Sequence, residues 1–169
     1  MRALLAFAFA FALISTAAFA HAGHDDAAGL LHGFMHPLGG LDHVLAMVAV
    51  GILASVLGGR ALYLVPLSFI VMMTAGFLLG AGSVEVPFIE LGIALSSVVI
   101  GGAAALGRPV PVLVAMALAG SFAVFHGVAH GIEMPVGATG FEYAFGFIAA
   151  TALLHAAGIA AATGVATLV

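Results

Sequence analysis

The sequence contains no cysteine and no tryptophan among its 169 residues, and it carries very little charge. The absence of cysteine excludes disulfides, thiolate metal sites, iron–sulfur clusters and a cysteine nucleophile. Charged residues make up only 6% of the chain, whereas a soluble domain carries about a quarter. With three Lys or Arg in total, the chain cannot neutralise a run of phosphates, so we expect no nucleic-acid partner.

Apolar side chains dominate instead, at 64% of residues and a mean hydropathy of +1.33. This content exceeds what one small core can bury, so the excess is expected to face lipid. The composition therefore predicts an integral membrane protein, in which eight retained histidines need an explanation.

The first twenty residues have the features of a secretory signal peptide. Arg2 supplies the positive charge, residues 3–14 are apolar, and Ala18-Phe19-Ala20 fits a cleavage site. Residues 21–169 would then form one transmembrane helical domain that begins outside the cytoplasm. An uncleaved first helix is the alternative. His21 and His24, just after the cleavage site, either capture metal or belong to an unstructured tail.

Five apolar stretches follow, each close to the roughly 20 residues that a membrane-spanning helix needs. Short linkers with Gly or Pro separate them, so neighbouring helices should pack antiparallel. The predicted fold class is all-α: a polytopic transmembrane helix bundle of about five mature spans after a signal peptide. The spans are expected near Leu38–Leu57, Ala61–Gly80, Phe88–Leu106, Val112–Gly131 and Phe141–Ala162.

The few charges agree with one orientation of these spans. If the mature chain begins outside, the loops at Arg60 and Arg108 lie in the cytoplasm, as the positive-inside rule expects. Seven of the remaining ionisable groups then gather at the outer helix ends, where such groups are tolerated only at a cost and usually serve a function. They are His36, Asp42, His43, Glu90, His126, His130 and Glu133.

The fourth span has the sharpest spacing, because His126, His130 and Glu133 follow one another at i, i+4 and i+7 on one helical face. Two histidines at i and i+4 can chelate one divalent ion. No glutamate follows the first histidine, so the metalloprotease motif is not matched. Alternatively, the two histidines are structural and bond across helices.

The first span repeats the pattern with His36, Asp42 and His43, although Pro37 and the Gly39-Gly40 pair make a regular helix doubtful here. Asp42 is either a direct ligand or a carboxylate that orients an imidazole. It is alternatively a helix cap.

Two further interpretations concern single residues, and a third concerns the donor set as a whole. Glu90 either joins the metal site or pairs structurally with a histidine. His155, in the inner half of the fifth span, is either an exit-side relay or a satisfied buried histidine. Imidazole and carboxylate donors without thiolate suit a borderline divalent ion such as Ni, Co or Zn.

The same residues carry a family resemblance. The run from His36 to Gly51, which begins His-Pro-Leu-Gly-Gly-Leu-Asp-His, resembles the signature of the HupE/UreJ family, and residues 125–133 resemble its second motif. The resemblance spans essentially the whole chain. That family comprises bacterial nickel/cobalt permeases associated with hydrogenase and urease maturation, and its members commonly carry a further apolar segment. The resemblance implies functional roles for His36, Asp42, His43, His130 and Glu133, with Phe69, Glu90 and His126 as further candidates.

Taken together, these patterns predict a permease of the bacterial inner membrane, with the mature N-terminus in the periplasm. Its partners would be the lipid bilayer and a divalent metal ion, Ni(II) first and Co(II) second, which is transported rather than held as a permanent cofactor. We expect no enzymatic activity. The chief alternative is an intramembrane zinc-dependent hydrolase, and a third possibility is a metal sensor or chaperone subunit.

Overall fold

The computed structural model describes residues 27–166, and this part of the chain is entirely helical apart from turns. The expected signal peptide, and the segment with His21 and His24, lie outside the described residues. The helices are α2 (Ala27–Gly39), α3 (Leu41–Leu57), α4 (Ala61–Ala81), α5 (Ile89–Leu106), α6 (Val112–Ile132) and α7 (Gly140–Ala166).

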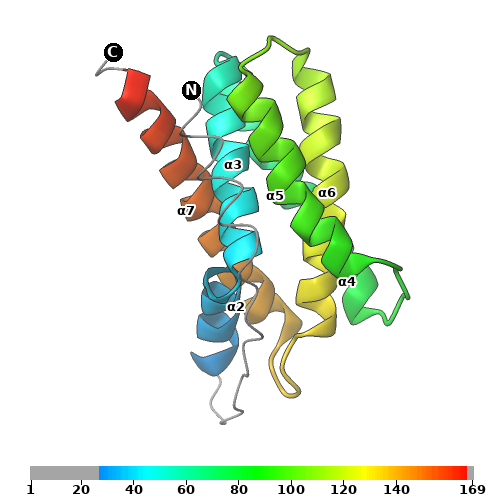
Figure 1. Cartoon of the computed structure of the whole chain (residues 1–169). Coiled ribbons are helices and arrows are strands. Elements are labelled where there is room, and N and C mark those ends of the chain that lie inside the picture. The colour runs from blue at the N-terminus through cyan, green and yellow to red at the C-terminus, as the bar shows by residue number, and fades with distance from the viewer. Residues whose placement is uncertain (1–26, 167–169) are drawn as a thin grey trace.

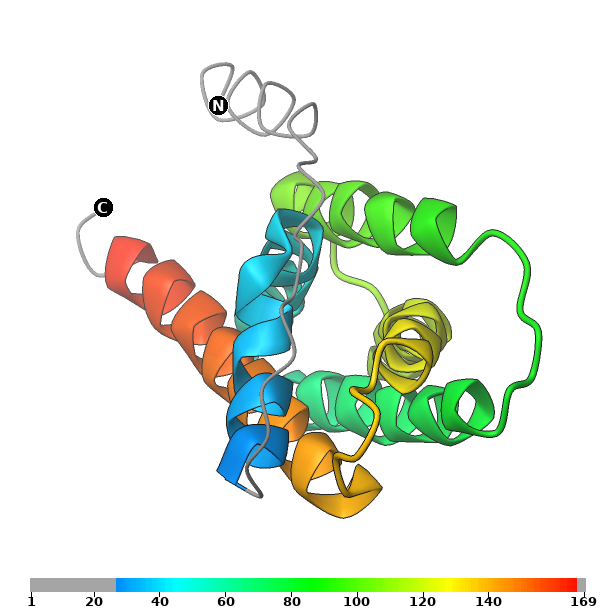
Figure 2. The ribbon, with the colours of Figure 1, turned by 90° about the horizontal axis from the view of Figure 1, so that it is seen from below.

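Helices α3 to α7 run alternately up and down and form a bundle, with the short α2 at its lower end (Figure 1). Helix α6 packs mainly on α4, α5 packs mainly on α3, and α7 packs on both α2 and α3. Seen from below, α6 lies end-on beside α4, with α7 on the opposite side of the bundle (Figure 2). The turns with Arg60 and Arg108 share one end, and segments 82–88 and 133–139 share the other (Figure 1).

The predicted spans agree closely with the observed helices, except at the first. Four helices in the described part, α4 to α7, are long and apolar enough to cross a membrane, and there are five spans if α2 and α3 together form one. We expected a single first span from Leu38. Instead, a separate helix, α2, ends at Gly39 and meets α3 at a bend of 83°.

The bend at Gly40 follows from the local sequence. Pro37 lies in the last turn of α2, where it lacks a backbone N–H, and Gly40 adopts an extended conformation with φ −103° and ψ 117°. The Gly40 carbonyl then accepts the first hydrogen bond of α3, from the Val44 N–H at 3.0 Å. The break places the polar residues on either side of it at the lower end of the bundle.

Small residues allow close contact between helices α4 and α6. A Cβ atom added at Gly127 would collide with the Met73 carbonyl oxygen, and one at Gly76 would collide with the Val124 carbonyl oxygen. The backbones of the two helices therefore touch without intervening side chains. This contact fixes the depth of His126 and His130 relative to α4.

Replacing Gly127 by Ala should lower the stability of the bundle, because the backbone of α4 cannot move aside as a side chain can. Overpacking of this kind costs about 1–3 kcal/mol. We expect a clearly lower thermal unfolding temperature of the purified protein in detergent. Gly102→Ala on α5 is the matched control, since a Cβ there meets no atom within 4 Å. Equal unfolding temperatures for the two variants would contradict this account.

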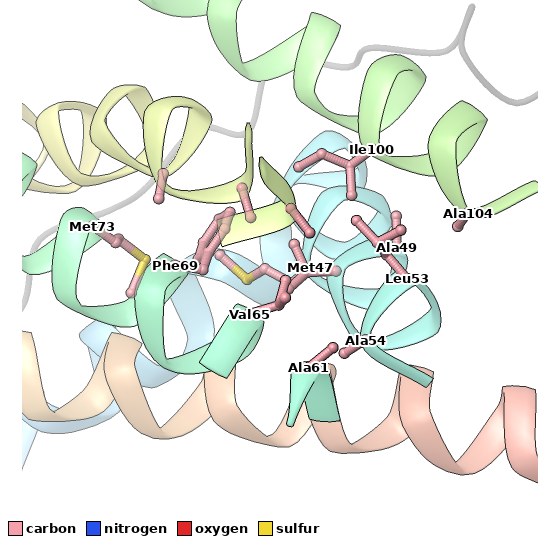
Figure 3. Close-up of a cluster of buried hydrophobic side chains, with 14 of the residues drawn as sticks. Met47, Ala49, Leu53, Ala54, Ala61, Val65, Phe69, Met73, Ile100 and Ala104 are labelled. Atoms are coloured by element: carbon pink, nitrogen blue, oxygen red, sulfur yellow. The ribbon is translucent and has the colours of Figure 1, made fainter. Parts of the chain in front are cut away.

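The apolar core fills the bundle above the polar end. Phe69 and Met73 of α4 point toward Met47 of α3, and Ile100 of α5 closes the cluster from another side (Figure 3). All four side chains are completely buried. This core separates the polar end of the bundle from the end with the arginines.

Candidate metal site

Four histidines and two carboxylates from three helices meet at the lower end of the bundle. His36 comes from the last turn of α2, Asp42 and His43 from the first turn of α3, and His126 and His130 from the last two turns of α6. Glu133 is the residue that ends α6. We call these six residues the histidine cluster. The bend at Gly40 and the 21-residue length of α6 bring the two motifs of the sequence together.

The imidazole rings of the cluster lie at separations that suit a shared ion. Ring centroids are 4.7 Å apart for His36 and His130, 4.7 Å for His43 and His126, and 5.5 Å for His43 and His130. The centroids of His36 and His43 are 6.0 Å apart. With metal–nitrogen bonds of about 2.0–2.1 Å, two rings on one ion have centroids at most about 6.5 Å apart.

Asp42 fixes the tautomer of His43. Its Oδ1 lies 3.1 Å from His43 Nδ1 and also accepts the His43 backbone N–H at 2.8 Å. Because a carboxylate can only accept, Nδ1 carries the ring proton and Nε2 keeps a free lone pair. That Nε2 is buried and has no hydrogen-bond partner among residues 27–166. The helix is capped by Gly40 without a side-chain bond, so Asp42 orients an imidazole rather than serving as the N-cap.

Ser96 of α5 fixes the tautomer of His126. The Ser96 hydroxyl donates its only proton to the Ile93 carbonyl, so its oxygen, 2.9 Å from His126 Nε2, accepts the N–H of the ring. Nδ1 of His126 therefore keeps the free lone pair, and within the described chain it has no partner. His126 is completely buried. Two histidines are thus each held by an oxygen on one side and left free on the other.

His130 lies beside His43, with ring centroids 5.5 Å apart, and is also completely buried. Its ring stacks on Phe147 of α7, with centroids 4.5 Å apart and planes inclined by 6°. Neither ring nitrogen has a hydrogen-bond partner in residues 27–166, nor does the hydroxyl of Tyr143 nearby. A buried polar group without a partner is costly. Of the two histidines of α6, His126 bonds across helices to Ser96, whereas His130 has no such bond among residues 27–166.

His36 and Glu133 lie beside each other on one side of the cluster. His36 Nε2 lies 3.2 Å from Glu133 Oε2, and the Glu133 side chain is half-exposed. Burial raises the pKa of Glu133, the charge of His43 lowers it, and the carboxylates of Glu90 and Asp42 raise it further. The acids at this end therefore lie within electrostatic reach of one another, and a cation would relieve their repulsion.

Two expectations from the sequence need qualification. Glu90 lies in the first turn of α5 and is exposed, and it has no hydrogen bond or ion pair with the cluster in the part of the chain described. Within residues 27–166, no three His, Asp or Glu side chains are already oriented to hold one ion. The distances between the imidazole rings are short enough for a shared metal ion. The side chains of the cluster would have to rotate before their donor atoms could bind the same ion.

Sequence reasoning missed Ser96 and Tyr143. Both are completely buried. Ser96 places its hydroxyl oxygen beside His126, and the ring of Tyr143 packs against that of His36. Neither lies in a run of polar residues, so no motif marked them. The one sequence signal was that each lies on the same helical face as other buried residues, of α5 for Ser96 and of α7 for Tyr143. Ordinary packing residues show the same pattern.

Replacing Ser96 by Ala should weaken metal binding without unfolding the protein, because His126 loses the acceptor that sets its tautomer. Loss of such a supporting group typically costs 10–100-fold in metal affinity, and we expect about tenfold. Binding of Co(II) to purified protein, followed by visible absorption, measures this. Ser97→Ala is the control, since in the described chain the Ser97 hydroxyl donates to the Ala94 carbonyl of its own helix and bonds no histidine. Unchanged Co(II) affinity in the Ser96 variant would refute the role of Ser96.

The fold and the histidine cluster define a helical membrane protein with imidazole and carboxylate groups gathered at one end of its bundle. The family model described as HupE / UreJ protein matches residues 9–168, and the chain belongs to this family. It is 45% identical to Protein HupE of Rhizobium leguminosarum bv. viciae over 147 residues, which cover 86% of this chain and 76% of that protein. No solved structure matches. Family membership supports a role as a nickel/cobalt transporter and does not favour the hydrolase alternative.

Proposed function

We propose that this protein is a permease that imports a divalent transition metal, Ni(II) first and Co(II) second, for the maturation of metalloenzymes. The single observation that supports this most is the set of buried imidazole nitrogens, on His43, His126 and His130, that have no hydrogen-bond partner within residues 27–166. Neutral imidazole is a good ligand for nickel, cobalt and zinc, and the cluster contains no softer thiolate donor.

In this proposal the cation enters from the periplasm at His36 and Glu133, whose side chains are 21% and 51% exposed. Rotation of the rings then replaces part of the water shell with nitrogen donors, while Asp42 and Glu133 balance the charge. Glu90 attracts the cation at the rim. We propose that all six residues of the histidine cluster, together with Glu90, are metal-binding groups.

The orientation follows from charge. Arg60 and Arg108 lie in turns at the end opposite the cluster (Figure 1), and the positive-inside rule places that end in the cytoplasm of the bacterial inner membrane. The mature N-terminus is then periplasmic. The sequence contains no P-loop motif. An inside-negative potential favours entry of a dication by about 4.6 kcal/mol per 100 mV, twice the value for a single charge.

The test is a transport assay with proteoliposomes or cells, using radioactive nickel and competition by Co, Zn and Mn. We expect accumulation that Co(II) inhibits best and that His36→Ala reduces. Binding without accumulation would indicate a sensor or chaperone subunit instead. Turnover of an amide or lipid by the purified protein, with no metal uptake, would favour the hydrolase.

A further inference from the structure

His155 of α7 is a buried histidine that the cluster does not include. Its side chain is 2% exposed, and neither ring nitrogen has a hydrogen-bond partner among the residues described. It is therefore not a satisfied core histidine, which was one of the two interpretations of the sequence. A buried polar group without a hydrogen-bond partner lowers the stability of the fold, so a functional role has to be considered for His155.

His155 continues a line of buried side chains that starts at the cluster. Tyr143, Phe147, Thr151 and His155 follow at intervals of four along one face of α7, and all are buried. Tyr143 and Phe147 contact the rings of His36 and His130. Twelve residues of helix from Tyr143 to His155 extend about 18 Å, more than half of the roughly 30 Å hydrocarbon core.

Phe69 of α4 lies between the cluster and His155. Its ring centroid is 5.5 Å from that of His126 and 5.2 Å from that of His155, against which it packs edge-on at 90°. Phe69 is completely buried beside Met47 and Met73 (Figure 3). An apolar ring thus separates the innermost histidine of the cluster from the next imidazole.

The space around this ring also contains weaker donors. The Thr151 hydroxyl lies 3.3 Å from the Met47 sulfur and 3.7 Å from the Met73 sulfur, and all three side chains are completely buried. Hydroxyl and thioether groups can solvate a passing cation without holding it tightly. No side chain of this inner group carries a charge.

We propose that His155 is a transient metal ligand on the inward side of Phe69, reached from His126 when the Phe69 ring rotates aside. This inference rests on the proposed transport function and adds the first step beyond the cluster. The cation exchanges one imidazole for another across a single aromatic ring. His155 then releases it toward the end that carries the arginines. The cluster determines binding, and His155 contributes to the rate of passage.

The experiment compares kinetics with binding. Proteoliposomes that contain a nickel-sensitive dye report uptake, and Co(II) titration of the purified protein reports binding at the cluster. His155→Gln should lower the maximal uptake rate about tenfold or more, with the half-saturating concentration and Co(II) affinity within about twofold of the unsubstituted protein. Leu53→Ala, at a buried position of α3, is the packing control and should keep its rate.

A second variant separates a ligand from a structural role. Because the chain has no cysteine, His155→Cys introduces a single thiol, a ligand that favours soft ions. We expect it to retain transport and to shift preference from Ni(II) toward Cd(II), which His155→Gln should not do. A purely structural histidine predicts no such shift.

Three results would overturn the inference: a normal rate with His155→Gln, an equal loss of Co(II) binding, or loss of both variants from the membrane. The last would assign His155 to packing. Absence of uptake by the unsubstituted protein would instead refute the proposed function. The two failures are therefore distinguishable.

Discussion

Replacing His130 by Ala should abolish nickel uptake, with a loss of at least about a hundredfold at subsaturating nickel. Removing a group that merely supports a ligand costs 10–100-fold in metal affinity, and a ligand should cost more. The His130 ring centroid lies 4.7 Å from that of His36 and 5.5 Å from that of His43. Both of its ring nitrogens are free of partners in residues 27–166.

Two control variants accompany this measurement of radioactive nickel uptake. His32→Ala removes a half-buried histidine of α2 that has no ring contact with the cluster in the described structure, and it should keep most uptake. Phe147→Leu removes the stacking partner of His130 but no ligand, and it should also keep most uptake. Normal uptake by the His130 variant would exclude it as a ligand. Loss of that variant from the membrane would indicate a structural role.

Replacing Asp42 by Asn is expected to have the second largest effect, a loss of uptake of about 10–100-fold. The amide preserves the size of the side chain and still offers an oxygen to the His43 ring, 3.1 Å away. It removes the negative charge that stabilises a dication in a poorly hydrated site. The variant therefore tests charge rather than shape.

Uptake and membrane level are measured together for Asp42→Asn and for Glu85→Gln. Glu85 is an exposed acid in the segment at the same end of the bundle, so its variant corrects for any general attraction of cations to this surface. We expect near-normal uptake for the Glu85 variant. Equal effects of the two substitutions would show that Asp42 contributes only to the surface potential.

The positions of the transmembrane helices were predictable to within a few residues. Their hydrophobicity is a local property, and a helix satisfies its own backbone hydrogen bonds inside lipid. The exception was α2, which is too short and too polar around His32 and His36 to count as a span by composition. The two histidine-containing motifs were also visible in the sequence, because i, i+4 spacing and adjacent residues define local geometry.

The sequence by itself determined that this is a helical membrane protein with a few imidazoles and carboxylates, since charge and hydropathy are set residue by residue. Only the tertiary structure decided that α2 and α3 meet at a bend of 83°, that the two motifs lie together at one end of the bundle, and that Ser96 sets the tautomer of His126 from 30 residues away. It also placed Phe69 between His126 and His155. The physical reason is that contacts between helices depend on which backbones can approach closely. That approach requires small residues on both helices, and these residues lie far apart in the chain.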